Sequence, residues 1–319
     1  MISRIRAERD DKLARVARRL RSLHDGDLAV IESIGIGTDA IPVLREVLFE
    51  RDRAGIFEPR VRAVRALGAL NATNVLKDFV ATWRPAVDPI ERLGDEAVLS
   101  ATARSLGATL DEQALSILCA VAREHPIPGV IETLGRFKRP ETIPILIDAL
   151  ADDCAATAAQ DALRSNPDQA VPSLIEIALR VTVGPSGREM PSSVRRRRRA
   201  LRLLLEMPVT GDARNRIARL AHDPDDEIAA LACRIAIAAD CEQPGRACAK
   251  RLVDLLRRAP WPLRKEIEDC LIEHLAVARE FVDRALGQPP GGHLVDSSQL
   301  QFRRSLERIK RSGSSARGH

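Results

Sequence analysis

EPRVRAVRALG at residues 58–68 and ETIPILIDAL at residues 141–150 show the two kinds of helix from which this 319-residue chain is built. Their apolar residues recur at spacings of three and four, which is typical of helices and gives strands little support. A Leu-Gly or similar pair ends the first kind of helix repeatedly, at Ile34-Gly35, Leu67-Gly68, Leu106-Gly107 and Leu134-Gly135, with Leu163-Arg164 as a variant. A glycine just after the last apolar residue is typical of a left-handed helix stop. The sequence therefore predicts helix pairs, each reversing at this glycine.

The second helix of each pair has a proline near its expected start. It occurs as TDAIPVLREVL at 38–48, ETIPILIDAL at 141–150 and DQAVPSLIEIAL at 168–179. Proline is tolerated in the first turn because the amide N–H that it lacks would have no partner there. Asp223-Pro224-Asp225-Asp226 predicts a further helix start.

The 58–68 segment resembles the first helix of a HEAT repeat, and the Ile-Pro-x-Leu helices resemble its second helix. The short unit is similar to the bacterial subtype also found in phycobilin lyases. The resemblance implies an all-α fold, an α-solenoid of about eight HEAT-like helix pairs with an N-terminal capping helix. We place the pairs at 25–50, 58–84, 94–124, 127–152, 154–181, 194–222, 225–258 and 261–287.

A single helix pair cannot bury its own apolar face, so neighbouring pairs must stack and the ends need caps. We expect a capping helix at 1–24, the solenoid at 25–287 with a loop insertion at 182–193, and a flexible basic tail at 288–319. Trp261 and Phe281 are expected to close the last pair.

Composition and charge exclude several classes of protein. Aromatic residues make up 3% of the chain and tyrosine is absent, which argues against stacking platforms for single-stranded nucleic acid. The N-terminal segment is charged throughout and no apolar run approaches the ~18 residues of a membrane span, so we expect a cytoplasmic protein. Its cysteines are interpreted as small buried thiols: Cys119, Cys154, Cys233, Cys241, Cys248 and Cys270.

Three motifs that could bind a cofactor or metal are better explained by the repeat. Residues 35–40 fit the dinucleotide pattern G-x-G-x-x-A, but they fall on the Leu-Gly register and no strand-helix alternation follows. The cysteines of residues 233–270, with His222 and His274, lack the C-x-x-C spacing of a zinc site. Glu124-His125 and Glu273-His274 reverse the His-Glu order of HEAT-fold di-iron hydroxylases. We expect no cofactor, no metal and no enzymatic activity.

Arg195 to Arg199 form the most informative local feature. At 100° per residue, five consecutive arginines encircle a helix, and counting back from Leu201, Leu204 and Leu205 puts Arg197 and Arg198 on the apolar stripe. An anion would relieve this conflict. The alternative is a helix that starts near Arg199, with the preceding arginines solvated. The anion hypothesis predicts a site for a phosphate or an acidic protein at Arg195, Arg196, Arg197, Arg198, Arg199, Arg214, Arg216 and Arg219.

The function expected from the resemblance is that of a scaffold or adaptor in a bacterial-type cytosol, which binds a protein partner along a concave face lined by second helices. The net charge is uneven: residues 1–22 are basic, 23–180 acidic, and 181–319 basic. Two alternatives stay open. The basic later half could bind nucleic acid, or the chain could be a phycobilin-lyase-like enzyme.

Overall fold

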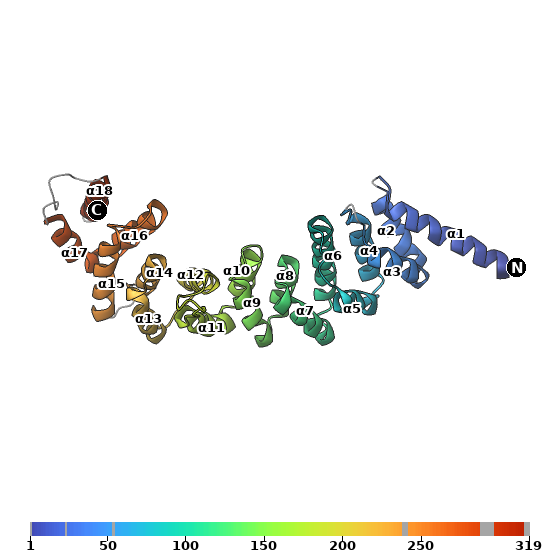
Figure 1. Cartoon of the computed structure of the whole chain (residues 1–319), viewed down its shortest axis with the longest axis horizontal. Helices are drawn as coiled ribbons and strands as arrows, with labels where there is room; N and C mark the ends of the chain where they lie inside the picture. Colours follow the sequence, from blue (N-terminus) through green and yellow to red (C-terminus); the bar gives the residue numbers. More distant parts are fainter. Residues whose placement is uncertain (1, 23, 53–54, 238–241, 288–296, 316–319) are drawn as a thin grey trace. The chain divides into compact units, whose positions relative to one another are not determined.

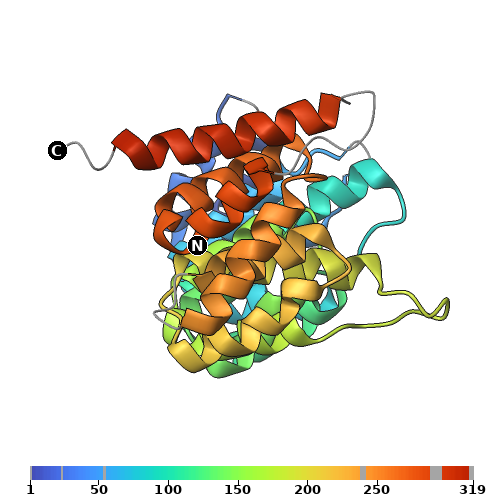
Figure 2. The same ribbon diagram turned by 90° about the vertical axis from the view of Figure 1, so that its left-hand side faces the viewer.

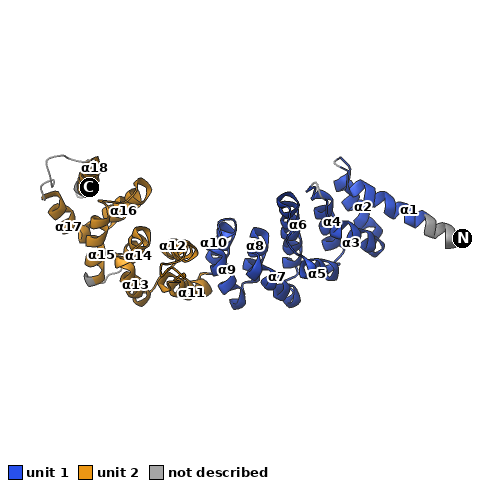
Figure 3. Ribbon diagram, in the orientation of Figure 1, with its two compact units in different colours: residues 1–166 blue, residues 167–319 orange. Residues whose placement is uncertain are grey.

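The computed structural model describes residues 2–22, 24–52, 55–237, 242–287 and 297–315. The chain divides into two compact units, Met1–Asn166 (unit 1) and Pro167–His319 (unit 2) (Figure 3). The division falls between the two helices of the pair expected at 154–181. Each unit is a stack of helices (Figure 1).

Unit 1 contains a capping helix followed by helix pairs and one further first helix. Its helices are α1 (Ile2–Leu20), α2 (Gly26–Ile36), α3 (Ile41–Phe49), α4 (Glu58–Ala69), α5 (Thr73–Thr82), α6 (Pro89–Gly107), α7 (Glu112–Glu124), α8 (Pro128–Phe137), α9 (Ile143–Ala149) and α10 (Ala156–Arg164). Short 3-10 turns at Gly37–Ala40 and Pro140–Thr142 lead into α3 and α9.

Unit 2 begins with a second helix and ends with a helix beyond the expected pairs. Its helices are α11 (Pro167–Leu179), α12 (Pro191–Glu206), α13 (Gly211–Ala218), α14 (Asp226–Ile237), α15 (Glu242–Leu255), α16 (Trp261–Glu273), α17 (Leu275–Gly287) and α18 (Ser297–Ser315). A 3-10 turn, η3 (Arg219–His222), precedes α14.

The helix order confirms the all-α solenoid class predicted from the sequence. The β-type pairing in the described residues is one isolated bridge, between Val183 and Glu189. Pro42 and Pro144 lie in the first turns of α3 and α9 as expected. Pro172 does not, because α11 already begins at Pro167 and takes Pro172 into its interior.

The first helices end at or within two residues of the repeated glycines, as expected, but these glycines are not left-handed helix stops, so that part of the prediction was wrong. Gly68 and Gly135 lie in the last turns of α4 and α8, Gly107 is the last residue of α6, and the left-handed residues come three positions after each glycine, at Asn71, Leu110 and Lys138. A Cβ at each glycine would collide with the next first helix, at Ser105, Thr133 and Ala162 respectively. The glycines therefore set the close approach of neighbouring first helices.

The two chain ends differ in how well they were predicted. Val16 and Leu20 of α1 are fully buried, as a capping helix requires, whereas Ile2 and Ile5 lie outside the described side chains. The tail expected at 288–319 contains α18, whose Leu306 and Ile309 are buried, so mobility was the wrong prediction for 297–315. Helical apolar spacing outweighs the high content of arginine and serine there.

Trp261 does not close the last pair. It stands at the first position of α16 with 77% of its surface exposed. Phe281 packs, partly buried, against the core of unit 2, and α18 completes that core.

Candidate functional site

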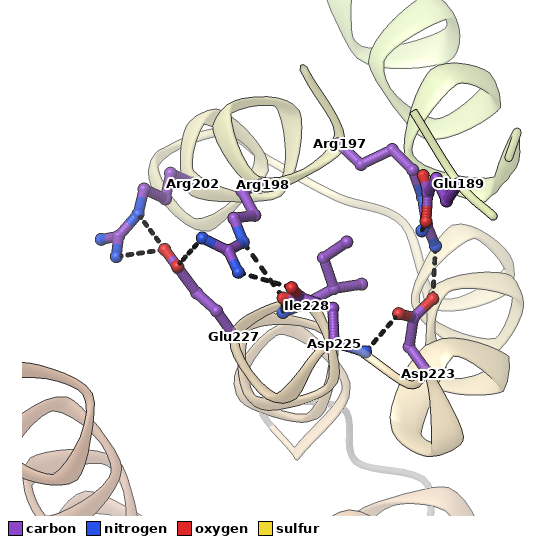
Figure 4. A network of polar contacts seen from close by, with 8 residues as sticks. All are labelled: Glu189, Arg197, Arg198, Arg202, Asp223, Asp225, Glu227 and Ile228. Carbon is purple, nitrogen blue, oxygen red and sulfur yellow. Dashed lines mark hydrogen bonds and ion pairs between the residues drawn. The ribbon is translucent and has the colours of Figure 1, made fainter. Parts of the chain in front are cut away.

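The arginine run lies on α12, which begins at Pro191, so the alternative of a helix that starts near Arg199 is wrong. Arg197 points into the protein and is 1% exposed. Its Nε donates to the carbonyl oxygen of Ala178 at the end of α11, 2.9 Å away. Its two terminal nitrogens donate to Glu189 at 2.8 Å and to Asp223 at 2.5 Å (Figure 4). The guanidinium is therefore fully engaged within the chain.

Arg198 binds a second pair of carboxylates beside Arg197. It donates to both carboxylate oxygens of Asp225, with Nε 3.0 Å from Oδ1, and forms an ion pair with Glu227 at 2.9 Å (Figure 4). Asp225 also accepts the amide N–H of Ile228 and so caps α14. Burial of Asp225 raises its pKa, but the hydrogen bonds from Arg198 and Ile228 outweigh burial and hold the pKa below its usual value.

The contacts continue from α12 across α14 to α16. Arg202 of α12 donates to Glu227 at 2.7 Å and to Glu266 of α16 at 3.3 Å. Glu266 also accepts from Arg234 of α14. Alternating arginines and carboxylates thus link three successive first helices of unit 2.

The hypothesis of an external anion stays a prediction, and the carboxylates that contact Arg197 and Arg198 come from the chain itself. Arg197 and Arg198 meet carboxylates of the η3–α14 segment and, for Arg197, of the preceding loop. Arg195 is exposed, Arg196 and Arg199 are half-buried, and all three have partners of their own. The sequence signal for these partners was present in the Asp-Pro-Asp-Asp helix start, which was interpreted only as a cap.

The remaining predicted site residues lie on the next helix and turn. Arg214 is half-buried and has a partner. Arg216 pairs with Glu176 of α11 at 2.6 Å, and Arg219 is exposed in η3. Arg197 and Arg198 have structural roles within the chain, and an external-anion site at the remaining arginines stays a prediction.

The loop insertion forms a hairpin-like projection that Arg197 anchors. It connects α11 to α12 and extends away from the helices of unit 2 (Figure 2). Its base is held by hydrogen bonds from Met190 N to Thr182 O and from Gly184 N to Arg188 O, both 2.9 Å. Glu189 of this loop is the carboxylate that contacts Arg197. The loop predicted at 182–193 is therefore an ordered structure fixed to the repeat core.

Unit 1 exposes large aliphatic side chains at the start of α6. Val87, Ile90 and Leu93 are 94%, 63% and 69% exposed, and Ile56 in the preceding loop is 49% exposed. Ile90 lies against Gly55, the residue directly before Ile56. We call Ile56, Val87, Ile90 and Leu93 the apolar patch. Sequence reasoning missed it because all four residues lie between the expected helix pairs, where no pattern assigned them to a surface.

A cavity opens next to the apolar patch. It has a volume of about 310 Å³ and shares Ile56 with the patch. Its other lining residues include Arg21, Arg51, Arg60, Glu50 and Asp52. The apolar patch is therefore bordered by charged groups of both signs.

A shallow groove runs between α8 and α10 of unit 1. Its volume is about 580 Å³ and small residues such as Gly135, Ala158 and Ala162 form much of its lining. Glu132, which also lines it, is held by Arg104 and Arg136. Burial raises the pKa of Glu132, but these two arginines lower it below its usual value. The groove lies between first helices, whereas the sequence resemblance placed the binding surface on second helices.

The described residues give the other candidate motifs structural roles. Residues 35–40 span the end of α2 and the following 3-10 turn. Four cysteines are buried thiols, Cys119, Cys233, Cys248 and Cys270, whereas Cys154 is exposed and Cys241 lies outside the described residues. In that described part, His, Cys, Asp and Glu form no group of three that could bind a metal. None of the helices described there is long and apolar enough to cross a membrane.

Neither a protein-family model nor a curated protein matches this sequence. Solved structures do match. A crystal structure of a Kap121p mutant aligns with 94% of this chain at a TM-score of 0.50 and 11% identity, and this chain spans 37% of the length of that one. That likeness shows the fold: the chain is an α-solenoid of helical repeats.

Two further structures share helical-repeat likeness at lower scores. The complex of CpcE and CpcF of phycocyanin lyase from Nostoc sp. PCC7120 matches 75% of this chain and 93% of that chain, with a TM-score of 0.33 and 18% identity. A structure concerning the interaction between cadherin and beta-catenin matches 95% of this chain and 86% of that chain, with a TM-score of 0.30 and 14% identity.

Proposed function

We propose that this protein is a non-enzymatic scaffold or adaptor of the cytoplasm that binds a protein partner, and that the apolar patch of unit 1 is a contact surface for it. The observation that carries the proposal is the exposure of three aliphatic side chains around the start of α6, Val87, Ile90 and Leu93, and of Ile56 in the segment that contacts α6. Contiguous exposed apolar surface of this kind marks interaction sites in folded proteins.

The local geometry supports a protein partner. Ile90 and Leu93 are one turn apart on α6, a spacing that receives the apolar face of another helix or loop. The adjoining cavity, with arginines and carboxylates in its lining, offers polar contacts around this apolar centre. An apolar centre with a polar rim is the usual composition of a protein interface.

The charges of unit 2 give less support to a nucleic-acid partner. Binding to a phosphate backbone depends on arginines and lysines that are available to it. Arg197 and Arg198, at the centre of the predicted basic site, are instead neutralised by Glu189, Asp223, Asp225 and Glu227.

The experiment is affinity capture from the native cell with the wild-type chain and the double variant Ile90→Ser/Leu93→Ser. We expect the variant to lose a specific partner and to unfold at nearly the wild-type temperature, because both side chains are exposed. Val183→Ser, an exposed aliphatic residue of unit 2, is the matched control and should retain the partner. Equal recovery of all partners by the wild type and the double variant would contradict the proposal.

Two other functions named from the sequence remain predictions that the same preparation can test. Duplex DNA retarded in a gel-shift assay at moderate salt would favour nucleic-acid binding. A change in the absorption spectrum on adding a bilin would favour a lyase-like activity.

A further inference from the structure

The C-terminal helix α18 occupies a ready-made helix-binding surface. Its Leu306 and Ile309 are 1% and 0% exposed and join the hydrophobic core of unit 2, which includes Ile267 and Leu271 of α16 and Val282 of α17. Phe302 is partly buried against the same core, and Arg257 stacks over its ring with 4.8 Å between guanidinium carbon and centroid. Residues 302, 306 and 309 lie on one face of the helix.

A buried carboxylate makes this surface selective. Glu268 of α16 is 4% exposed. It accepts hydrogen bonds from the Ser305 hydroxyl at 2.5 Å and from Arg308 at 2.7 Å, both on α18. A helix that covered Glu268 without such donors would leave a buried charge unpaired, which disfavours its binding. At the edge of the surface, Asp283 of α17 pairs with Lys310 at 2.8 Å.

The inner face of α18 is packed and hydrogen-bonded, with Gln301 also accepting from Arg264, whereas its outer part stays exposed. Leu300 is 48% exposed, and the side chains of Arg308 and Lys310 are each 59% exposed although both form ion pairs. A cavity of about 60 Å³ remains beside Lys310, lined also by Leu275, Val282 and Asp283 of α17. Leu306 and Ile309 are the two fully buried aliphatic anchors of α18, and ordering the helix offsets part of the stabilisation that their burial provides. Such an anchor set can be displaced by a competing helix.

We propose that the surface of α16 and α17 under α18 is a docking site for an amphipathic helix of a partner protein, and that α18 is its internal competitor. The chemistry of the partner follows from the contacts of α18. The partner helix should carry three apolar side chains at the spacing of Phe302, Leu306 and Ile309. It should also carry an arginine and a hydroxyl side chain at the positions equivalent to Arg308 and Ser305. The charge complementarity lies in Glu268 and Asp283 facing a basic helix. This site is independent of the apolar patch of unit 1.

The test uses the full-length double variant Leu306→Asp/Ile309→Asp, which cannot seat its own α18. The probe is a fluorescent peptide with the sequence of residues 297–315. We expect the peptide to bind the variant at least tenfold more tightly than the wild-type chain, in which α18 occupies the surface. A peptide with Arg308→Ala should bind the variant about tenfold more weakly, whereas Arg304→Ala, on the exposed face, should bind like the native peptide.

The role of Glu268 is tested by adding Glu268→Gln to the double variant. This substitution should lower the affinity for the native peptide. It should also reduce the difference in affinity between the native peptide and the Arg308→Ala peptide. Equal peptide binding to the wild type and the double variant, or no binding to either, would overturn the proposal. Loss of the apolar-patch partner in the Ile90→Ser/Leu93→Ser variant bears on the proposed function alone, because that substitution leaves unit 2 intact.

A second measurement uses the unmodified chain and therefore does not depend on whether the double variant folds. Excess native peptide should speed hydrogen exchange in α18 and leave exchange in α16 unchanged. Unaltered exchange in α18 at saturating peptide overturns the proposal. So does a wild-type dimer that becomes monomeric in the double variant, because a second copy would then be the occupant.

Discussion

Arg60 and Arg197 perform the same task at equivalent positions of their repeats, one in each unit. Each is buried on a first helix, two turns before a buried leucine. The Nε of Arg60 donates to the carbonyl oxygen of Leu48 in the last turn of α3, at 2.8 Å, and that of Arg197 donates to Ala178 in the last turn of α11, at 2.9 Å. Carbonyl groups at helix ends lack partners within the helix, so each arginine caps the preceding second helix.

Both guanidinium groups also bind an aspartate that follows in the chain. Arg60 pairs with Asp95 of α6, and Arg197 pairs with Asp223 just before α14. Asp95 and Asp223 are themselves buried. An arginine at this position therefore joins three successive parts of the repeat array.

Arg197→Met should destabilise unit 2 strongly. It leaves buried Asp223 without its cation, and breaking one side of a buried ion pair costs about 3–5 kcal/mol. Urea denaturation followed by circular dichroism measures the effect. Arg219→Ala, at an exposed position, should change stability by less than about 0.5 kcal/mol, and similar losses in both variants would contradict the structural role of Arg197.

Gly135→Ala should destabilise unit 1 by about 1–3 kcal/mol, because the new methyl group overpacks the contact with α10. A Cβ at residue 135 would lie 3.0 Å from the Cα of Ala162, a backbone atom that cannot move aside by itself. Gly35→Ala is the control, since nothing lies within 4 Å of a Cβ there, and alanine should raise helix stability by up to about 1 kcal/mol. Thermal unfolding measures both variants: Gly135→Ala should unfold at a lower temperature than the wild type, and Gly35→Ala at the same or a higher one.

Asp225 should make stability depend on pH in acid. Its pKa in the folded protein is below the usual value, although burial opposes this, because Arg198 and the amide of Ile228 stabilise the charged form. The stabilisation is therefore complete above the unfolded pKa of about 3.9 and is lost as the pH falls through the folded pKa. Asp225→Asn should cost about 1–2 kcal/mol at pH 7.

Urea titrations at pH 7, 4 and 3 check this expectation. The stability difference between the wild type and Asp225→Asn should shrink as the pH falls below 4. Asp254→Asn, on the exposed surface of α15, serves as the control. A difference that stays constant over this range would show that the charge of Asp225 does not contribute.

Trp261→Ser should leave the stability of unit 2 within about 0.5 kcal/mol of the wild type, because the indole is 77% exposed. Leu263→Ser, at a position 7% exposed on the same helix, should cost several kcal/mol by removing buried apolar surface. If the two substitutions lowered the stability of unit 2 by comparable amounts, Trp261 would contribute to the core after all.

The periodic helices were predictable because apolar spacing and helix-start residues act locally. Asp225 shows this well: a cap was expected near it, and it caps α14. The glycine register was also visible, but its role was not. The role of Gly68 is to let its helix approach Ser105 of the next first helix. That role depends on the distance between the two helices, which cannot be deduced from the sequence.

The arginine run was only half predictable, for a similar reason. Helical geometry correctly put Arg197 on the buried face of α12. Its partners, Glu189 and Asp223, lie in a loop and a turn, where no periodic pattern fixes the direction of a side chain. The sequence therefore indicated the need for an anion without revealing its source.

The glycine contacts make the two sides of unit 1 mechanically unequal. In unit 1, neighbouring first helices contact each other more extensively than neighbouring second helices do. At residues 68, 107 and 135 the first helices are already in such close contact that they cannot move closer together. Flexing of unit 1 must therefore pivot about the first-helix row, while the spacing of the second helices widens and narrows. A ligand that selects among these conformations would do so by setting the second-helix spacing, even when it binds on the opposite side.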